Sequence, residues 1–168
     1  MKTSPKEYIL EKWLWTDADF EQMGWHDSHI HAVAFLPEQF EVAFDIDYIL
    51  QWVQPAEDKY YRFWVAPATL VFENIHDLKF DIEPFEAVEI ADLHKDNPQR
   101  PINAEYIGRD TDWQWRIETH QGDITLRAIG YKQYFRRQPL FGRLQSLDLA
   151  TRGGFSFSRE HERVPPTV

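Results

Sequence analysis

The sequence predicts an α+β fold that is mainly β: an antiparallel sheet rolled into a sandwich or open barrel, with one or two short N-terminal helices. Three observations support this fold class. Helix start signals are confined to the first 24 residues, later segments alternate apolar and polar residues, and turn residues separate those segments. Because each strand with one apolar face must bury it, we expect the strands to close into packed layers with the helices at one end.

Length and composition favour a single domain, residues 1–168, with a packed core. Apolar residues make up 43% of the chain and aromatic residues 15%, which is typical of a folded protein rich in large rings. The chain has no cysteine, which excludes disulfides and thiolate metal sites. No apolar run approaches the roughly 18 residues that span a bilayer, and the N-terminus holds no uninterrupted apolar signal core. We therefore expect a cytoplasmic protein that does not enter a membrane.

The first 24 residues are predicted to form a helical cover. Residues 4–7 (SPKE) combine a serine N-cap, a proline at the first helical position and a glutamate, and predict a helix to about Leu14. Residues 16–19 (TDAD) are a second start signal. The short helix that follows is expected to end near Met23, with Gly24 as a left-handed cap.

Residues 23–52 carry the clearest structural signal, which is a β-hairpin with two different faces. Alternating runs at 30–36 and 40–48 flank a break at 37–39, and a three-residue loop there sets the register. One face is then entirely apolar. Its cross-strand pairs are Leu36–Phe40, Ala34–Val42, Ala32–Phe44 and Ile30–Ile46.

The other face of this hairpin holds the candidate functional residues. The predicted register places His29 opposite Asp47 and His31 opposite Asp45, close enough to interact across the ladder. Two imidazoles with a carboxylate can form an open zinc or iron site, so His29 and His31 are candidate metal ligands. In a catalytic site, an aspartate would orient a histidine that acts as general base. The alternative is a solvated sheet face with His–Asp hydrogen bonds and no cofactor, which we favour. The whole polar group comprises His26, Asp27, His29, His31, Asp45 and Asp47.

Further strands are predicted downstream, so that the sheet spans residues 28–137. Proline cannot donate to a ladder, and Pro67 therefore predicts an edge position, a bulge or a break in the strand at 61–73. Residues 94–101 (HKDNPQRP) are expected to form a long exposed loop, and residues 139–168 an irregular C-terminal segment. The remaining predicted strands cover 78–83, 87–93, 105–108, 113–119 and 124–130, the last with an extension over 131–137.

Aromatic residues form a second candidate binding surface. Rings that alternate along strands can line a pocket for an apolar or sugar ligand, and ordinary core packing is the alternative. The group comprises Trp52, Tyr60, Tyr61, Phe63, Trp64, Trp113 and Trp115.

Charge is distributed unevenly along the chain. Residues 1–100 hold 8 basic and 20 acidic side chains, whereas residues 101–168 hold 10 basic and 8 acidic ones. Within 127–163 there are eight basic and three acidic side chains, and we expect this basic segment to pair with the acidic half. Acidic residues on neighbouring strands can instead present a negative surface to a basic protein. The acidic series comprises Asp45, Asp47, Glu73, Asp81 and Glu83.

Two stretches of the hairpin carry a family resemblance. Residues 23–27 (MGWHD), followed by Ile30, and residues 45–48 (DIDY) resemble small bacterial proteins with a W-H-D…I opening strand, among them immunity proteins of bacterial toxin systems. The resemblance implies an α+β or mainly β domain that binds and neutralises a toxin. It carries over no catalytic residue.

The sequence therefore favours a bacterial binding protein of immunity type that acts through an acidic surface on a basic protein partner. A net charge of −10 argues against nucleic acid as the partner. A small-molecule-binding β-barrel lined by aromatic residues is one alternative, and it requires an enclosed apolar cavity. A metal-dependent enzyme that uses the polar face of the hairpin is another. The chain holds no phosphate-binding loop, nucleophile elbow or zinc-protease motif, so a binding role is favoured over catalysis.

Overall fold

Antiparallel strands dominate the part of the chain that the structure describes, and the helices are short. The computed structural model describes residues 7–54, 57, 59–83 and 86–163. The strands are β1 (Leu14–Thr16), β2 (His29–Leu36), β3 (Glu41–Val53), β4 (Arg62–Glu73), β5 (His76–Ile82), β6 (Val88–Gln99), β7 (Asp112–Thr119), β8 (Gly122–Ala128), β9 (Gly130–Phe135) and β10 (Leu140–Gly142). The helices are η1 (Asp17–Gln22), η2 (Pro37–Gln39), α1 (Ala104–Ile107) and α2 (Leu149–Arg152), of which η1 and η2 are 3₁₀ helices.

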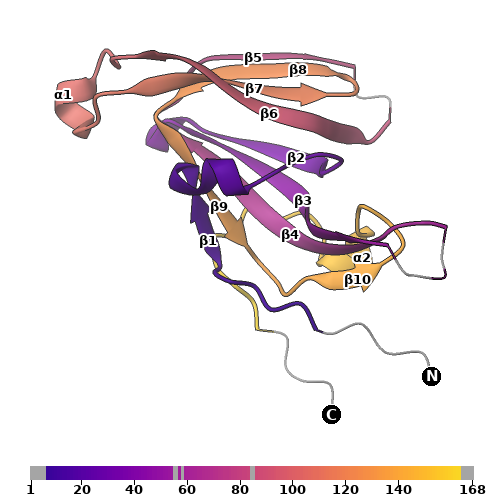
Figure 1. Ribbon diagram of the computed structural model, residues 1–168. Coiled ribbons are helices and arrows are strands. Elements are labelled where there is room, and N and C mark those ends of the chain that lie inside the picture. Colours follow the sequence, from indigo (N-terminus) through magenta and orange to yellow (C-terminus); the bar gives the residue numbers. More distant parts are fainter. Residues whose placement is uncertain (1–6, 55–56, 58, 84–85, 164–168) are drawn as a thin grey trace.

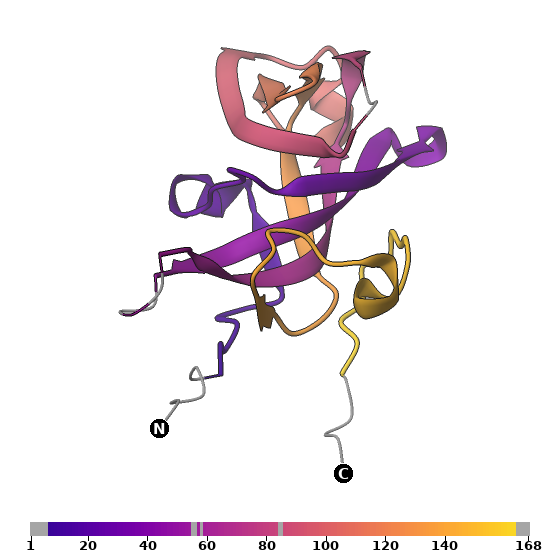
Figure 2. The same ribbon diagram turned by 90° about the vertical axis from the view of Figure 1, so that its right-hand side faces the viewer.

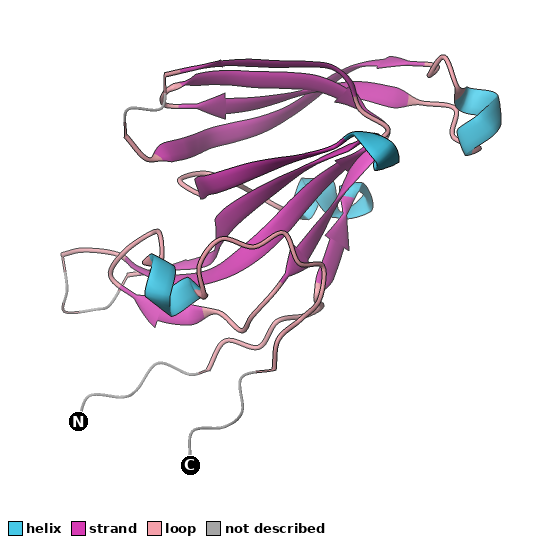
Figure 3. Cartoon of the chain, turned by 180° about the vertical axis from the view of Figure 1, so that it is seen from behind, coloured by secondary structure: helices cyan, strands magenta, loops and turns pink. Residues whose placement is uncertain are grey.

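The strands form two layers that derive from one rolled antiparallel sheet, in the order β1-β9-β4-β3-β2-β6-β7-β8-β5. The first layer, lower in Figure 1, holds β1, β9, β4, β3 and β2, with β10 paired to β4. The second layer, above it, holds β6, β7, β8 and β5. Figure 3 shows the same two layers from behind, with strands throughout and only short helices. The mainly β, α+β fold is thus as predicted.

The core lies between the two layers, which are joined to each other along both sides. On one side β2 pairs with the start of β6, and on the other the chain passes from β8 directly into β9. Large rings fill the space between, with centroids of neighbouring rings 5.5–6.0 Å apart. Each such pair contributes about 0.5–1.5 kcal/mol beyond the burial of its area. The fully buried rings are Trp25, Phe44, Phe72, Trp115, Tyr131 and Phe135.

The N-terminal segment contains one short helix rather than two. The first predicted helix is wrong over residues 7–14, which form no helix and lead into β1, while its start at residues 4–6 lies outside the described residues. The second is confirmed as η1, where Thr16 and Asp19 form a capping box. The Thr16 side chain accepts a hydrogen bond from a backbone N–H in the first turn of the helix, and the Asp19 side chain accepts one from the Thr16 N–H. Gly24 is not its left-handed cap, because η1 ends on Met23 in an extended conformation.

The β2–β3 hairpin exists, but two irregularities alter its register. Phe40 adopts a left-handed conformation with φ 55°, which lengthens the loop to four residues and pairs Leu36 with Glu41. A β-bulge at His31 then restores the predicted pairs Ile30–Ile46 and His29–Asp47. The predicted pairs Leu36–Phe40, Ala34–Val42, Ala32–Phe44 and His31–Asp45 are wrong. Between the loop and the bulge, the pairing of β2 with β3 is shifted by one residue from the predicted register, and such a shift exchanges the two faces of a strand. Val33 and Phe35 therefore face the second layer, where the prediction had Ala32 and Ala34.

Pro67 neither breaks its strand nor lies at the edge of the layer. Its strand, β4, runs unbroken between β3 and β9. The partner changes instead: β10 pairs with residues 63–65 and β9 with residues 68–73, and Pro67 lies between these two ladders. The missing N–H of proline therefore falls where neither ladder requires a donor.

Three other predictions fail where local signals were weak. Residues 94–99 continue β6 instead of forming a loop, since they pair with β7. Residues 104–107 form α1 where a strand was predicted at 105–108. Residues 130–135 are a separate strand, β9, that belongs to the first layer and does not extend β8. The first and third outcomes depend on partner strands that local sequence does not specify.

The C-terminal segment, residues 139–163 in the described part of the chain, folds back over the first layer. Figure 2 shows it on the side of that layer that faces away from the second layer. It contributes β10, which pairs with β4, and α2, which lies over the middle of β3. The segment is therefore less irregular than predicted, and it decides the environment of the residues described next.

Candidate functional site

Asp45 and Asp47, predicted to lie on a solvated face, are fully buried, with 0% exposure for both residues. Alternation along β3 sends Phe44 and Ile46 into the core between the layers and the two aspartates to the opposite side. There the C-terminal segment covers them. A buried carboxylate needs a cation and hydrogen-bond donors in place of water.

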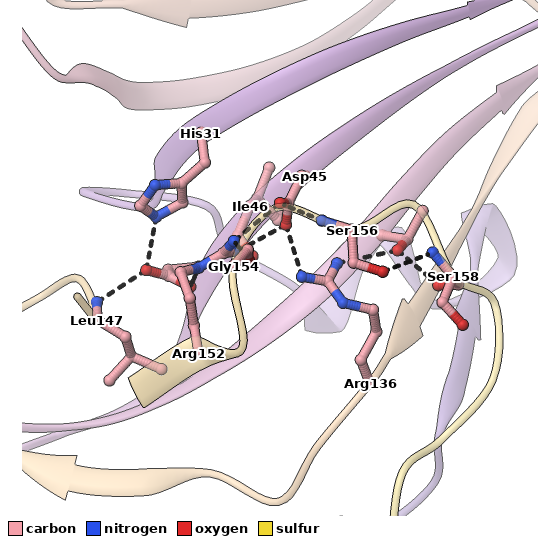
Figure 4. Close-up of polar contacts among 11 residues, drawn as sticks. His31, Asp45, Ile46, Arg136, Leu147, Arg152, Gly154, Ser156 and Ser158 are labelled. Carbon is pink, nitrogen blue, oxygen red and sulfur yellow. Dashed lines mark hydrogen bonds and ion pairs between the residues drawn. The ribbon is translucent and has the colours of Figure 1, made fainter. Parts of the chain in front are cut away.

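Arg152 supplies the main countercharge from the last turn of α2. Its Nη1 and Nη2 donate to the two carboxylate oxygens of Asp45 at 2.8 and 2.6 Å, and its Nε donates to Asp47 at 3.1 Å (Figure 4). The sequence around it explains its position. Asp148 caps α2 by accepting from the Thr151 N–H at 2.8 Å, and Gly153 ends the turn with φ 82°.

Arg136, just beyond β9, brings a second cation to the same place. Its Nη2 donates to Asp45 Oδ1 at 2.7 Å and its Nη1 to Thr69 at 3.0 Å (Figure 4). Two aspartates and two arginines thus balance in charge. We call these four residues, Asp45, Asp47, Arg136 and Arg152, the buried ion cluster.

Backbone donors of the C-terminal segment complete the buried ion cluster. The Leu147 N–H donates to Asp47 at 2.8 Å and the Ser156 N–H donates to Asp45 at 2.9 Å. Burial alone would raise the pKa of Asp47, but hydrogen bonds from His31 and Leu147, together with the Arg152 charge, hold that pKa below its ordinary value. The cluster therefore fixes the C-terminal segment to the sheet, and Asp45 and Asp47 offer nothing to an external partner.

His31 and His29 lie beside the cluster but do not converge on a metal. His31 donates from Nε2 to Asp47 Oδ2 at 2.7 Å, with 18% of its side chain exposed. It borders an open groove of about 370 Å³ together with His29, Leu149 and Phe155. Nδ1 of His29 is buried and has no hydrogen-bond partner among the residues that the structure describes. Among the described residues, the group whose possible ligand atoms converge is a different one, and neither histidine belongs to it.

The aromatic candidates divide into two sets: Phe63, Trp64 and Trp115 are buried and Trp113 packs against the core, whereas Trp52, Tyr60 and Tyr61 are exposed. Trp64 is nearly buried, with 9% exposure, and its ring packs against Phe141 and Tyr8 at centroid distances of 5.1 and 5.9 Å. Trp115 is fully buried in the core. Large rings fill the space between the two layers, so the aromatic residues there pack the core.

Glu73 also stands apart from the other acidic candidates. It lies at the end of β4, is partly buried, and forms an ion pair with Lys132 at 3.5 Å. Its charge is therefore already matched within the first layer. The two remaining members of the acidic series, Asp81 and Glu83, are exposed in β5 and directly after it.

The outer face of the second layer carries a row of carboxylates that crosses all four strands. Asp92 on β6 pairs with Glu118 on β7, Glu118 pairs with Asp123 on β8, and Asp123 pairs with Asp81 on β5. Directly opposed residues in antiparallel strands project to the same side. Asp92 and Asp81 are exposed, and the side chains of Glu118 and Asp123 are 42% and 44% exposed. We call these four residues the carboxylate row.

Neighbouring cations offset the carboxylate row only in part. Arg116 lies 3.6 Å from Asp123 and 4.0 Å from Glu118, and His94 lies 2.8 Å from Glu118. The hydrogen bond from His94 holds the pKa of Glu118 below its ordinary value. Asp81, at the end of the row, forms no ion pair with a described residue. The row is thus an exposed acidic feature in the folded protein.

The carboxylate row contains one residue that the sequence suggested, Asp81, and three that it did not. The turn between β7 and β8 could have predicted that Glu118 and Asp123 lie opposite each other. A two-residue turn at His120 and Gln121 sets Thr119 opposite Gly122 and therefore Glu118 opposite Asp123, as the structure has them. The predicted pairing of the basic C-terminal segment with the acidic half is confirmed by Arg136 and Arg152.

No protein-family model matches this chain, and comparisons with curated proteins and with solved structures find no significant match either. Among the described residues, no helix combines the length and the apolar character needed to cross a membrane. Function must therefore be argued from the geometry alone.

Proposed function

We propose that the protein is a protein-binding module of immunity type, which docks a basic protein partner on the outer face of its second layer. The carboxylate row carries this proposal. Like charges placed directly opposite one another on neighbouring strands destabilise a sheet, and this fold aligns four of them. A basic partner would replace that repulsion with attraction.

Other acidic residues at the same end of the layer extend the negative field. Glu83 and Glu86 are exposed where β5 ends and β6 begins. The Glu83 N–H donates to the Gln121 carbonyl, so this end of β5 lies against the β7–β8 turn beside the carboxylate row. A concentrated field of one sign steers an oppositely charged protein and raises its rate of association. The same field repels nucleic acid.

Affinity capture with a charge-reversed variant tests the proposal. We expect the wild-type protein to capture a basic protein from a lysate of its host at about 50 mM salt and to lose most of it at about 500 mM, because salt screens exposed charges. The double variant Asp81→Lys/Asp123→Lys should lose the captured protein even at low salt. The readout is the amount of captured protein on a stained gel, identified by mass spectrometry.

A matched variant separates the surface from net charge. Glu7→Lys/Glu160→Lys changes the net charge by the same amount at exposed positions in the N-terminal and C-terminal segments, which lie on the far side of the first layer from the second layer (Figure 1). It should capture as much as the wild type. Equal capture by all three proteins, or equal loss in both variants, would refute docking on the carboxylate row.

A further inference from the structure

Three possible metal ligands from three separate segments meet at the acidic end of the second layer. They are Asp27 in the loop before β2, Glu89 in β6 and His120 in the β7–β8 turn, and one ligand atom of each lies within 4.8 Å of the other two. An ion bound at about 2.1 Å to each would hold these atoms about 3.4 Å apart. His120 is exposed and the carboxylates are partly exposed, so small side-chain rotations can close the remaining distance.

Backbone hydrogen bonds fix the three segments to one another at the ligand positions themselves. The Asp27 N–H donates to the Ile90 carbonyl at 2.8 Å, and the His120 N–H donates to the Glu89 carbonyl at 3.0 Å. The Glu89 N–H in turn donates to the side chain of Gln121 at 3.0 Å. The group is therefore held together by the fold before any ion binds, which lowers the entropic cost of binding.

The electrostatics of this group favour a cation. Among the described residues, no lysine or arginine forms an ion pair with Asp27 or Glu89, in contrast to the buried ion cluster. The Gln145 amide donates to Asp27 Oδ2 at 2.7 Å and orients that carboxylate. Two carboxylates this close repel each other, and a divalent cation is what would balance them.

A second imidazole, that of His26, has an unprotonated ring nitrogen directed toward the Asp27 carboxylate. Nδ1 of His26 lies 3.1 Å from the Ala91 carbonyl, which can only accept, so Nδ1 carries the proton. In the neutral ring Nε2 is then unprotonated, and it lies 3.6 Å from Asp27 Oδ1. Such a backbone contact commonly fixes the tautomer of a metal-binding histidine. Nε2 of His120 lies 3.8 Å from the same oxygen on its own side.

We infer that Asp27, Glu89 and His120 form a binding site for a first-row divalent transition metal such as Zn²⁺, with His26 placed to contribute a fourth ligand. Imidazole nitrogen with carboxylate oxygen suits zinc, whereas magnesium and calcium prefer oxygen alone. The site goes beyond the proposed docking of a partner and does not depend on it. It also assigns a role to the W-H-D stretch, in which Trp25 is buried in the core and Asp27 reaches the surface cluster.

Isothermal titration calorimetry with zinc chloride on the metal-stripped protein tests the site without any partner present. We expect one Zn²⁺ per chain in the wild type and a much weaker response to magnesium chloride. Asp27→Asn, Glu89→Gln and His120→Ala should each weaken zinc binding at least tenfold, by loss of a ligand. Asparagine is chosen at position 27 because it tolerates the positive φ of 63° found there.

Matched variants elsewhere on the surface control for nonspecific uptake. His94→Ala and Glu105→Gln remove a partly exposed histidine and an exposed glutamate outside the group, and both should bind zinc as the wild type does. Absence of stoichiometric zinc in the wild type, or less than a tenfold loss in both Glu89→Gln and Asp27→Asn, would overturn the inference. These two variants are close to isosteric, so circular dichroism should confirm their fold and they decide the outcome if His120→Ala does not fold.

Discussion

Two sets of carboxylates on the outer faces of the two layers have opposite environments. Asp45 and Asp47 on β3 are completely buried, and arginine side chains bind both. Asp81 and Asp123, on β5 and β8, lie opposite one another near solvent, with Arg116 close to one of them. In sequence, all four are aspartates on alternating strands, and nothing in that alternation separates the two sets.

The covering segment makes the difference. The C-terminal segment folds over the first layer and brings Arg152 and several backbone N–H donors to Asp45 and Asp47. The outer face of the second layer has no comparable cover among the described residues, so its carboxylates remain in contact with water. Burial makes a matched cation obligatory, whereas exposure lets like charges persist at small cost.

The largest expected effect is from Arg152→Met, which tests whether the buried ion cluster is as important as its burial implies. Methionine keeps much of the side-chain volume but leaves Asp45 and Asp47 without their main countercharge. Removing one partner of a buried pair costs about 3–5 kcal/mol. We expect that loss in the free energy of unfolding, measured by urea denaturation.

Arg143→Met is the control for that experiment. Arg143 is exposed in the same C-terminal segment, and the described residues include no acidic partner for it. Its replacement should change the free energy of unfolding by no more than about 0.5 kcal/mol. If Arg152→Met lowers the free energy of unfolding by less than about 1 kcal/mol, the buried aspartates do not depend on a matched cation, and the contrast with the exposed carboxylates is wrong.

An intermediate effect is expected from His31→Ala, which removes the side-chain donor to Asp47. A hydrogen bond to a charged group contributes about 1.5–3 kcal/mol, and we expect a loss near the lower end of that range at neutral pH. The folded-state pKa of Asp47 lies below the ordinary value of 3.8. Its ionised form therefore stabilises the fold above pH 3.8, and this contribution is lost as the pH falls through the folded-state value.

Acid denaturation gives a second readout of the same change. Without His31, the pKa of Asp47 in the folded protein rises, so the variant should begin to lose stability at a higher pH than the wild type. His31→Gln keeps an N–H donor and should shift the acid transition less. Coincident acid transitions in the wild type and His31→Ala would show that the bond to Asp47 does not contribute.

The smallest expected effect is from Asp81→Asn in the carboxylate row, and its sign is opposite. Removing one of two like charges that face each other should raise the free energy of unfolding by a few tenths of a kcal/mol. The gain should shrink as salt increases. Asp96→Asn is the control, because Asp96 lies opposite the neutral Gln114. An equal gain in both variants would attribute the effect to net charge and not to the row.

The hairpin shows how far the sequence could be used for prediction. The pairs Ile30–Ile46 and His29–Asp47 are correct although the assumed loop is one residue too short, because the bulge at His31 compensates. Neither the left-handed Phe40 nor the bulge at His31 has a local sequence signal of its own. The bulge is also what brings His31 to Asp47 instead of Asp45.

The residues of the candidate metal site could likewise be predicted only in part from the sequence. The sequence singled out residues 26–31, where histidines and an aspartate cluster, and Asp27 of that stretch belongs to the group of converging ligand atoms, whereas His29 and His31 do not. Glu89 and His120 could not be added, since their proximity depends on β6 and the β7–β8 turn meeting the loop before β2. Separations of 62 and 93 residues from Asp27 are beyond any local pattern.

The sequence alone determined which residues of β3 face the core, where most strands run, and that the fold is mainly β. These follow from alternation, a property of neighbouring residues that backbone geometry imposes on every strand. Only the tertiary structure decided that Asp45 and Asp47 are buried. Their environment depends on Arg152, which lies 107 residues beyond Asp45 and reaches it because the C-terminal segment folds over the sheet. Burial and charge pairing are set by contacts between distant segments, which periodicity does not encode.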